Sequence, residues 1–388
     1  MLMVVCVAIL TVLVLSEFTY AKVSGSTCSN CHTMHNSQNA SRMRLDDTPI
    51  TGSGSGECLD CHAETRAVLL RLDCLGCHAQ DPGGGTNIIN SNWPQIAHNA
   101  PTYLSGGNYR YVFTDDTYGH NVHGFGSLIG TDSNLGNNPP GYNSNYDPST
   151  GKYQPGNTAG QVMCAGQNGC HGNRNQLIPY LAMKGTHHAD DSILKFGVGF
   201  TETGQGGGTG STSDFTTAGK SYRFLYNVHG GEDSDWQATE GSSDHNEYKG
   251  SVYGSSHALS QTWNSIDTIS ELCAECHGYF HLGGSSGIGS SSPWLRHPTD
   301  IVIPNTGEYA QYNTPNTGTS QYSLIAPLAR QNIPNSSSGS VTLNSDVVMC
   351  LSCHRAHASP YYKIMRWDYK NWPASGTNGC SVCHTSKN

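Results

Sequence analysis

The chain has 388 residues, of which 46 are glycine, 36% are hydrophobic and only 13% are charged. This composition excludes an ordinary aliphatic core for a chain of this length, so another apolar material must fill the interior. The formal net charge is −9 at pH 7, which argues against a nucleic-acid partner.

The N-terminal segment predicts export from the cytoplasm. An apolar run, Met1–Leu15, is followed by the small residues Thr19 and Ala21 at the positions that signal peptidase requires. An uncleaved anchor is the alternative, because no Lys or Arg precedes the run, but the run is short for a membrane span. We expect residues 1–21 to be a signal peptide and residues 22–388 to form a single domain.

A Cys-x-x-Cys-His sequence begins at Cys28 and recurs along the chain. It is the attachment signature of c-type haem, in which two thiols bond the haem covalently and the adjacent histidine ligates the iron. Zinc sites do not require that adjacent histidine, so six copies with one spacing argue against zinc. The six copies are Cys28/Cys31/His32, Cys58/Cys61/His62, Cys74/Cys77/His78, Cys273/Cys276/His277, Cys350/Cys353/His354 and Cys380/Cys383/His384.

A seventh site is irregular, because five residues separate Cys164 from Cys170, which His171 follows. A disulfide or a pair of thiols is the alternative interpretation. We favour haem, since the histidine directly follows the second cysteine and the glycines between the cysteines let the extra residues bulge outward. With this site, every cysteine except Cys6 is assigned, and the sequence predicts seven covalently attached haems c.

Few regular elements are expected between these sites. Residues 22–80 carry three sites, with a short helix over Ala63–Leu72. Residues 81–272 are rich in Gly, Ser and Asn without sustained periodicity, which predicts loops around the irregular site. Residues 273–388 carry three more sites, and a helix that carries the first of them is expected over Ile269–Phe280.

Two further stretches of the loop region have a distinct composition. Residues 201–220 read as a Gly/Thr/Ser linker, and the acidic Gly231–Asp235 is expected to be a solvated turn or a weak cation site.

With so little aliphatic sequence, the fold class predicted is mostly coil with a few short α-helices and little β-structure. Such a chain wraps around closely stacked haems, which serve as its apolar core.

The second axial ligand of each iron decides what the haems do. Of the 19 histidines, twelve remain after the seven proximal ones, which is enough for a second histidine at every iron. Two histidines close both axial positions, and this favours electron transfer over substrate activation; methionine is the alternative at single sites. The distal candidates are His35, His98, His120 or His123, His187 or His188, His281, His297 and His357, with His229, His245 and His257 in reserve.

The position of His35 suggests a particular role. Only three residues after His32, it cannot easily reach the opposite face of the same haem, so it must serve another haem or none.

The chain also resembles a known family, the extracellular, filament-forming multihaem cytochromes with doubled Cys-x-x-Cys-His motifs. The stretches that carry the resemblance are Cys28–Ser37, Cys273–His281 with Leu295–Pro298, and Cys350–Ser359.

The resemblance implies a head-to-tail homopolymer in which this histidine crosses to the neighbouring subunit. Carried over, His35 ligates the haem held by Cys350, Cys353 and His354 of the next copy. A contact of this kind that does not close on itself generates an open polymer.

The leading hypothesis is a secreted, extracellular or outer-surface conduit for electrons. It would receive electrons from periplasmic or outer-membrane cytochromes and deliver them to external acceptors such as minerals, partner cells or electrodes. A monomeric shuttle, secreted or periplasmic, is the alternative and could use His35 internally. A multihaem reductase is disfavoured, because none of the seven motifs ends in Lys. We expect an electron-transfer protein and not an enzyme.

Overall fold

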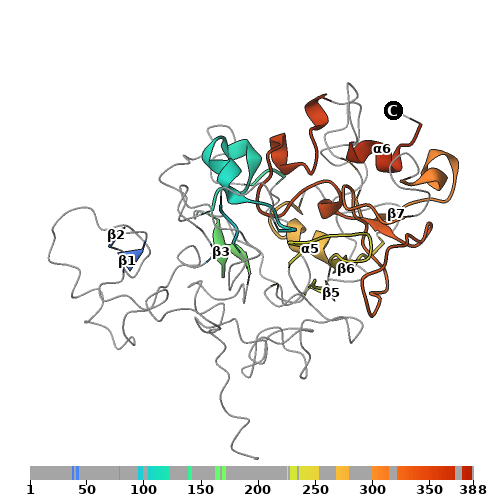
Figure 1. Ribbon diagram of the computed structural model, residues 1–388, viewed down its shortest axis with the longest axis horizontal. Helices are drawn as coiled ribbons and strands as arrows, with labels where there is room; N and C mark the ends of the chain where they lie inside the picture. Colours follow the sequence, from blue (N-terminus) through green and yellow to red (C-terminus); the bar gives the residue numbers. More distant parts are fainter. Residues whose placement is uncertain are drawn as a thin grey trace, which may run out of the picture.

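The structure, a computed structural model, is mostly coil (Figure 1). The residues that it describes are 78, 95–98, 104–122, 139–141, 162–166, 168–171, 225, 228–233, 236–252, 268–278, 297, 299–313, 321–371 and 378–386, with the backbone of 37–38 and 41–42. Within these ranges the expected fold class, coil with few short helices and little β-structure, is confirmed. The predicted signal peptide 1–21, helix Ala63–Leu72 and linker 201–220 lie outside the described residues.

Helices and strands in the described part are short. The strands are β1 (Ser37–Gln38), β2 (Ser41–Arg42), β3 (Met163–Ala165), β4 (Gly169–His171), β5 (Gly230–Gly231), β6 (Glu247–Tyr248), β7 (Ile301–Val302) and β8 (Val347–Val348). The α-helices are α5 (Ile269–Ala274) and α6 (Gly379–Cys383), and the 3-10 helices are η4 (Tyr109–Phe113), η5 (Asp116–Tyr118), η7 (Gly307–Gln311), η8 (Cys350–Ser352), η9 (Tyr362–Ile364) and η10 (Tyr369–Asn371). Strand β3 pairs with β4 in parallel; β1 with β2, β5 with β6, and β7 with β8 are antiparallel.

Helix α5 begins at Ile269, where the sequence predicts its start. The Thr268 hydroxyl accepts a hydrogen bond from the backbone N–H of Glu271 at 3.1 Å. A side-chain oxygen in this position satisfies one of the N–H groups that the first turn of a helix leaves without a partner. The start of the helix is therefore fixed by its cap.

The predicted end of this helix at Phe280 is wrong, because α5 stops at Ala274. Of the two cysteines that the helix was expected to carry, only Cys273 lies within it, and Cys276 lies in the turn that follows. The backbone N–H of Cys276 donates to the carbonyl of Cys273 at 3.2 Å, a bond between residues three apart that tightens the chain out of the α-helix. The turn continues towards Gly278, a residue type that stabilises helices poorly.

The apolar core of the described part is divided into three small clusters. The largest contains Ile303, Tyr312, Tyr322, Ala326, Leu328, Val341, Val348, Trp367 and Val382. The second contains Val228, Tyr248, Ile269, Leu272, Ala329, Val347 and Met349, and the third Ala97, Tyr109, Val112, Val122 and Ala358. Cys353, Cys380 and Cys383 pack against the largest cluster, so these attachment cysteines lie at the border of the apolar core.

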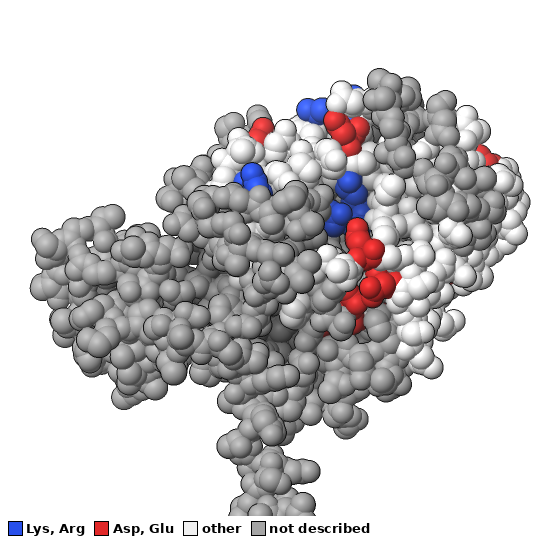
Figure 2. Space-filling view, in the orientation of Figure 1, with Lys and Arg blue, Asp and Glu red and all other residues white. Residues whose placement is uncertain are grey.

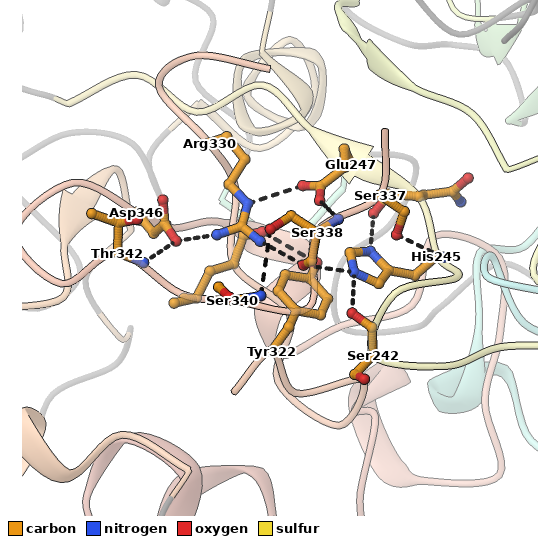
Figure 3. A network of polar contacts seen from close by, with 12 residues as sticks. Ser242, His245, Glu247, Tyr322, Arg330, Ser337, Ser338, Ser340, Thr342 and Asp346 are labelled. Atoms are coloured by element: carbon orange, nitrogen blue, oxygen red, sulfur yellow. Dashed lines mark hydrogen bonds and ion pairs between the residues drawn. The ribbon is translucent and has the colours of Figure 1, made fainter. Parts of the chain in front are cut away.

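A buried arginine forms hydrogen bonds with three separate segments in the second half of the described chain (Figure 3). Arg330, only 6% exposed, donates from Nε to Glu247 at 3.0 Å and from Nη1 to Asp346. Its Nη2 donates to the carbonyl of Ser338 at 3.1 Å, and the guanidinium lies 5.0 Å from the centre of the Tyr322 ring. Burial opposes the charge, yet the two carboxylates raise the pKa of Arg330 above its ordinary value.

His245, a reserve ligand in the sequence analysis, belongs to the same network. Its ring stacks on Tyr322 with 3.9 Å between centroids and 2° between planes. Nδ1 lies 2.8 Å from the carbonyl of Asn246, and Nε2 lies 3.1 Å and 3.3 Å from the carbonyls of Ser242 and Ser338 (Figure 3). Both ring nitrogens are engaged within the fold, so His245 has a packing role in place of a ligand role.

In the described part of the acidic stretch, Gly231–Asp233, the acidic residues are not solvated as the sequence suggests. Glu232 and Asp233 are both buried, at 9% and 5% exposure. The Asp233 carboxylate accepts a hydrogen bond from the backbone N–H of Gln237 at 2.9 Å. It therefore stabilises the turn at Trp236 and Gln237, whose φ angles of 58° and 60° are in the left-handed region.

The surface reflects the low charge content of the sequence. Figure 2 shows a face on which Lys, Arg, Asp and Glu form small groups among larger uncharged areas. Among the helices that the structure describes, none has both the length and the apolar character needed to cross a membrane.

Replacing Arg330 tests the importance of the buried network. We expect Arg330→Met to lower the free energy of unfolding of the holoprotein by about 3–5 kcal/mol, because it removes the cation that faces the buried carboxylates of Glu247 and Asp346. Chemical denaturation followed by circular dichroism measures this change. The control is Lys370→Met, since Lys370 is exposed and its amine lies over the Tyr362 ring, a contact worth about 1 kcal/mol or less. Equal denaturation midpoints for the two variants would contradict the prediction.

Candidate metal centres

The three regular motifs that are fully described share one backbone turn. In each, the backbone N–H of the histidine donates to the carbonyl of the first cysteine. The pairs are His277 with Cys273 at 2.9 Å, His354 with Cys350 at 3.0 Å and His384 with Cys380 at 2.8 Å. Positions three and four apart in a helical turn lie on the same face. Each turn therefore brings two thiols and one imidazole to one side, as covalent attachment and ligation of one haem require.

The second cysteine of the first of these motifs, Cys276, differs from the sequence expectation in its backbone. It lies past the end of α5, in a turn, whereas Cys383 at the same place in the last motif lies within α6. The tight bond from its N–H to the Cys273 carbonyl keeps the two cysteines on one turn despite this difference. Cys276 is half-buried and stays a predicted attachment residue.

The irregular motif has a different backbone. Cys164 lies in β3 and Cys170 in β4, and these two strands pair in parallel. Gly166 has a φ of 82°, and a Cβ on Gly169 would lie 2.6 Å from the backbone nitrogen of Ala165, so both positions require glycine.

None of the cysteines that the structure describes is joined in a disulfide. They are Cys164, Cys170, Cys273, Cys276, Cys350, Cys353, Cys380 and Cys383. For the irregular motif this argues against the disulfide interpretation. All of these thiols are thus available for the thioether bonds of c-type haem.

Cysteines of different motifs lie close together. A hydrogen bond with Cys350, burial, and the nearby thiols of Cys170 and Cys276 raise the pKa of Cys273 well above its ordinary value. Thiols held neutral in this way are poor nucleophiles and poor thiolate ligands.

The last two motifs are neighbours in the same manner. Burial, followed by the thiols of Cys383 and Cys380, raises the pKa of Cys353 to about 12. Burial, with the thiol of Cys380, raises that of Cys383 to about 12 as well. Cys353 and Cys383 are therefore held as neutral thiols, which are poor nucleophiles.

Histidines from distant parts of the chain meet in pairs. In each pair one histidine ends a motif and the other is a distal candidate from the sequence. The ring centroids are 6.1 Å apart for His120 and His277, 6.0 Å for His171 and His357, and 6.1 Å for His297 and His384, with interplanar angles of 46°, 51° and 78°.

This spacing fits two imidazoles that ligate one metal ion from opposite sides. A bond of about 2 Å to each ring nitrogen, with the half-widths of two rings, separates the ring centres by about 6 Å. Within the described ranges no three His, Cys, Asp or Glu side chains converge as a metal-binding group. Two histidines at this separation are the arrangement found in a haem with two axial histidines.

In several motif and candidate histidines, Nδ1 lies within hydrogen-bond distance of a backbone carbonyl. The contacts are His120 with the carbonyl of Ala356 at 2.7 Å, His277 with that of Pro140 at 2.6 Å and His354 with that of Lys363 at 3.0 Å. An Nδ1–H that donates to a carbonyl leaves the lone pair on Nε2 for a metal. Burial lowers the pKa of His120, which favours the neutral form that ligates.

His357 is positioned by an aromatic ring and a glycine. It stacks on Tyr109 with 5.0 Å between centroids and 22° between planes. A Cβ on Gly106 would lie only 2.7 Å from Nδ1 of His357, so a larger residue cannot occupy this position without displacing the ring. Burial, followed by the proximity of His171, lowers the pKa of His357 to about 3.

His354 is exposed. The Lys363 carbonyl that contacts Nδ1 of His354 lies in a strained part of the backbone. Lys363 and the next residue, Ile364, are both in the left-handed region, with φ angles of 57° and 61°. The Ile364 carbonyl accepts a hydrogen bond from the backbone N–H of Arg355 at 2.9 Å. Such strain in non-glycine residues is typical of functional sites. His354 is thus firmly held and open to the surface.

His98 is buried, with 1% exposure, and Asn108 fixes its backbone on both sides. The backbone N–H of His98 donates to Asn108 Oδ1 at 3.2 Å, and Asn108 Nδ2 donates to the His98 carbonyl at 2.8 Å. Nδ1 of His98 has no hydrogen-bond partner. Burial, with a smaller effect of Arg110, lowers the pKa of His98. The nearby backbone N–H of Ile96 donates to the His78 carbonyl at 2.7 Å, so His98 lies close in sequence to a contact with the third motif.

Other predicted site residues lie outside the described residues. They are Cys28, Cys31, His32, His35, Cys58, Cys61, His62, Cys74, Cys77, His123, His187, His188 and His281, with His257 from the reserve. His229 is described and half-buried beside β5.

Sequence reasoning missed the residues that support the histidines, among them Glu308. Its Oε1 lies 3.1 Å from Nδ1 of His384, and its Oε2 accepts a hydrogen bond from the Ser386 hydroxyl at 2.5 Å. These hydrogen bonds, first that of Ser386 and then that of His384, lower the pKa of Glu308 to about 2. An isolated acidic residue carries no sequence signal for such a role, and neither do the carbonyl of Lys363 and the missing side chain of Gly106.

Comparison with known proteins agrees with this geometry. Residues 21–67 and 344–388 match the protein family described as the doubled CXXCH motif. The chain is 25% identical over 409 residues to the C-type cytochrome OmcS of Geobacter sulfurreducens, which covers 96% of this chain and 86% of that protein. The chain resembles OmcS. The resemblance expected from the motifs is thus confirmed.

Two solved structures from Geobacter sulfurreducens are also similar. The outer membrane cytochrome S filament is 21% identical, with 89% of this chain and 84% of that chain covered and a TM-score of 0.39. The OmcS nanowires are 19% identical, with 88% and 83% covered and a TM-score of 0.39.

Gly106→Ala tests whether His357 is positioned as described. We expect the new methyl group to displace the imidazole, because its carbon would lie 2.7 Å from Nδ1. Electron paramagnetic resonance of the holoprotein should then show that one low-spin ferric component is lost or altered. Gly241→Ala is the matched control, since its nearest neighbouring atom would be 3.8 Å away. Identical spectra for Gly106→Ala and wild type would show that His357 is held differently.

Proposed function

We propose that this protein transfers electrons through covalently attached haems whose irons are each held between two histidines. The observation that supports this most directly is the set of three histidine pairs with ring centroids 6.0–6.1 Å apart, each joining a motif histidine to a distant one. Two histidines leave no open coordination position for a substrate, whereas a reductase needs one. The pairing therefore favours electron transfer over catalysis.

From these pairs we propose ligands for three of the centres. Beyond the proximal histidines, His120 ligates the haem held by Cys273 and Cys276, His357 that held by Cys164 and Cys170, and His297 that held by Cys380 and Cys383. His98, with its buried and unsatisfied Nδ1, supplies a ligand to one of the other centres. His35, His188 or its neighbour His187, and His281 remain the candidates for the rest, with His123 as the alternative to His120. The haem supplies the change of iron oxidation state, and the protein supplies its axial ligands and excludes water.

We count seven haems in a single domain over residues 22–388, after removal of a signal peptide over residues 1–21. The pairing of β3 with β4, which carry Cys164 and Cys170, and the contact of His171 with His357 support haem at the irregular motif. The proximity of cysteines from different motifs supports close spacing of the haems, since Cys273 lies near Cys350 and Cys353 near Cys380.

We further propose that the protein forms a head-to-tail polymer outside the cell. The exposed His354 suits a ligand from a neighbouring copy, and His35 is the candidate. The relative OmcS, 25% identical over most of the chain, is named as a filament in its solved structures. Such a polymer would take electrons from periplasmic or outer-membrane cytochromes and deliver them to external acceptors.

The haem count has a direct test at the irregular motif. Intact-protein mass spectrometry of the secreted holoprotein should give seven haems, and the double variant Cys164→Ser/Cys170→Ser should give six, because both thioether bonds of one haem are removed. The reference variant Ser340→Ala changes an exposed residue outside the motifs and should leave the count at seven. Six haems in the wild type, with Cys164 and Cys170 unmodified, would show that the irregular motif binds no haem.

The polymer has a separate test at His35. We expect His35→Ala to abolish or shorten filaments in electron micrographs and to leave one iron per subunit without its second histidine. Asn36→Ala, a change in the adjacent residue that removes no imidazole, should polymerise normally. If His35→Ala forms normal filaments with unchanged low-spin spectra, the ligand between subunits is another residue. Monomers of the wild type at high concentration would instead indicate a discrete electron shuttle.

A further inference from the structure

The contacts behind the axial histidines differ in one respect at the C-terminal centre. At His120, His277 and His354, Nδ1 faces a backbone carbonyl, a neutral acceptor. At His384, Nδ1 faces the Glu308 carboxylate, with 3.1 Å between Nδ1 and Oε1. Among the Nδ1 contacts that the structure describes, this centre alone has an anionic acceptor.

The fold holds the Glu308 carboxylate in place from several sides. Glu308 is in the first turn of η7, which packs against α6, the helix that carries Cys380 and Cys383. The Ser386 hydroxyl donates to Oε2 at 2.5 Å, and the Thr385 hydroxyl donates to the backbone carbonyl of Glu308 at 2.7 Å. The carboxylate is only 16% exposed. The two residues that follow His384 thus form hydrogen bonds with Glu308, and the second carboxylate oxygen, Oε1, faces His384.

A carboxylate behind a ligating imidazole changes the properties of the iron. Hydrogen bonds to ionised acceptors are shorter and about twice as strong as those to neutral ones. An imidazole whose N–H donates to a carboxylate becomes a more basic ligand, because the ring gains anionic character. A more basic ligand stabilises ferric over ferrous iron, and hydrogen bonding of this kind is one of the ways in which a protein sets a haem potential.

We propose that Glu308 is a positioning residue that gives the haem at Cys380, Cys383 and His384 a lower reduction potential than the described centres whose histidines face carbonyls. This inference rests on the proposed haem-binding function and deepens it. Because neighbouring centres then differ in potential, the C-terminal centre donates electrons to its neighbours more readily than it accepts them. Glu308 thereby raises the energy of an electron at the C-terminal centre relative to those described centres.

Glu308→Gln tests the proposal, because the amide oxygen still accepts the hydrogen bond but carries no charge. The potentials of the purified holoprotein are measured by spectroelectrochemistry. We expect the lowest-potential component to become easier to reduce by about tenfold in its one-electron equilibrium, or about 59 mV. Asp368→Asn is the control: it removes one exposed charge next to Trp367, whose ring lies against Gly379 of α6, and should leave that component unchanged. Equal shifts for both variants, or none for Glu308→Gln, would overturn the proposal.

A second variant covers the case in which Glu308→Gln folds poorly. Ser386→Ala keeps the carboxylate and removes a competing donor, so the charge acts more strongly on His384. The lowest potential should then stay in place or fall further, and a rise would contradict the proposal. Peptide mass spectrometry of every variant shows whether haem is attached at Cys380 and Cys383. Absence of haem there in the wild type would overturn the proposed function as well, whereas full attachment with unchanged potentials overturns the role of Glu308 alone.

Discussion

The arrangement depends on the convergence of two imidazoles from distant segments at one point. His120 and His277, His171 and His357, and His297 and His384 each meet at the separation that two ligands of one metal require. Short motif turns present one member of each pair, and irregular segments deliver the other. A ligand pair of this kind crosslinks segments that share little secondary structure. The proposed haems thus supply both the redox chemistry and the long-range connections that sheets provide in other folds.

The polypeptide keeps its loops in place with polar contacts where apolar side chains are few. Arg330 joins Glu247, Asp346 and the carbonyl of Ser338, and it closes the loop between β6 and β8. A buried ion pair stabilises little compared with apolar packing, but it tolerates few alternative arrangements. This specificity suits a chain whose interior must form around rigid cofactors, because a small displacement of a loop would separate a histidine from its iron.

The sequence predicted the chemistry of the sites better than their pairing. The Cys-x-x-Cys-His spacing identifies the attachment residues, because three groups on one helical turn are a local property. The pairing of His120 with His277 depends on contacts between loops without periodicity, which no local pattern encodes. The same limit applies to Asp233, where acidity indicated a solvated turn but the carboxylate is buried beneath Gln237. Coil content followed from composition, whereas α5 ends early because the backbone at Cys276 tightens into a turn.

The two ends of the described C-terminal region suggest how a polymer could have a direction. His354 lies exposed and is held by a strained segment at Lys363 and Ile364, as suits an iron completed by another copy. His384 has its partner His297 within the chain and an anion behind it. In the proposed polymer, the first centre would meet the neighbouring copy and the second would have the distinct potential. Since every subunit of a head-to-tail polymer points the same way, an asymmetry within one subunit is repeated along its whole length.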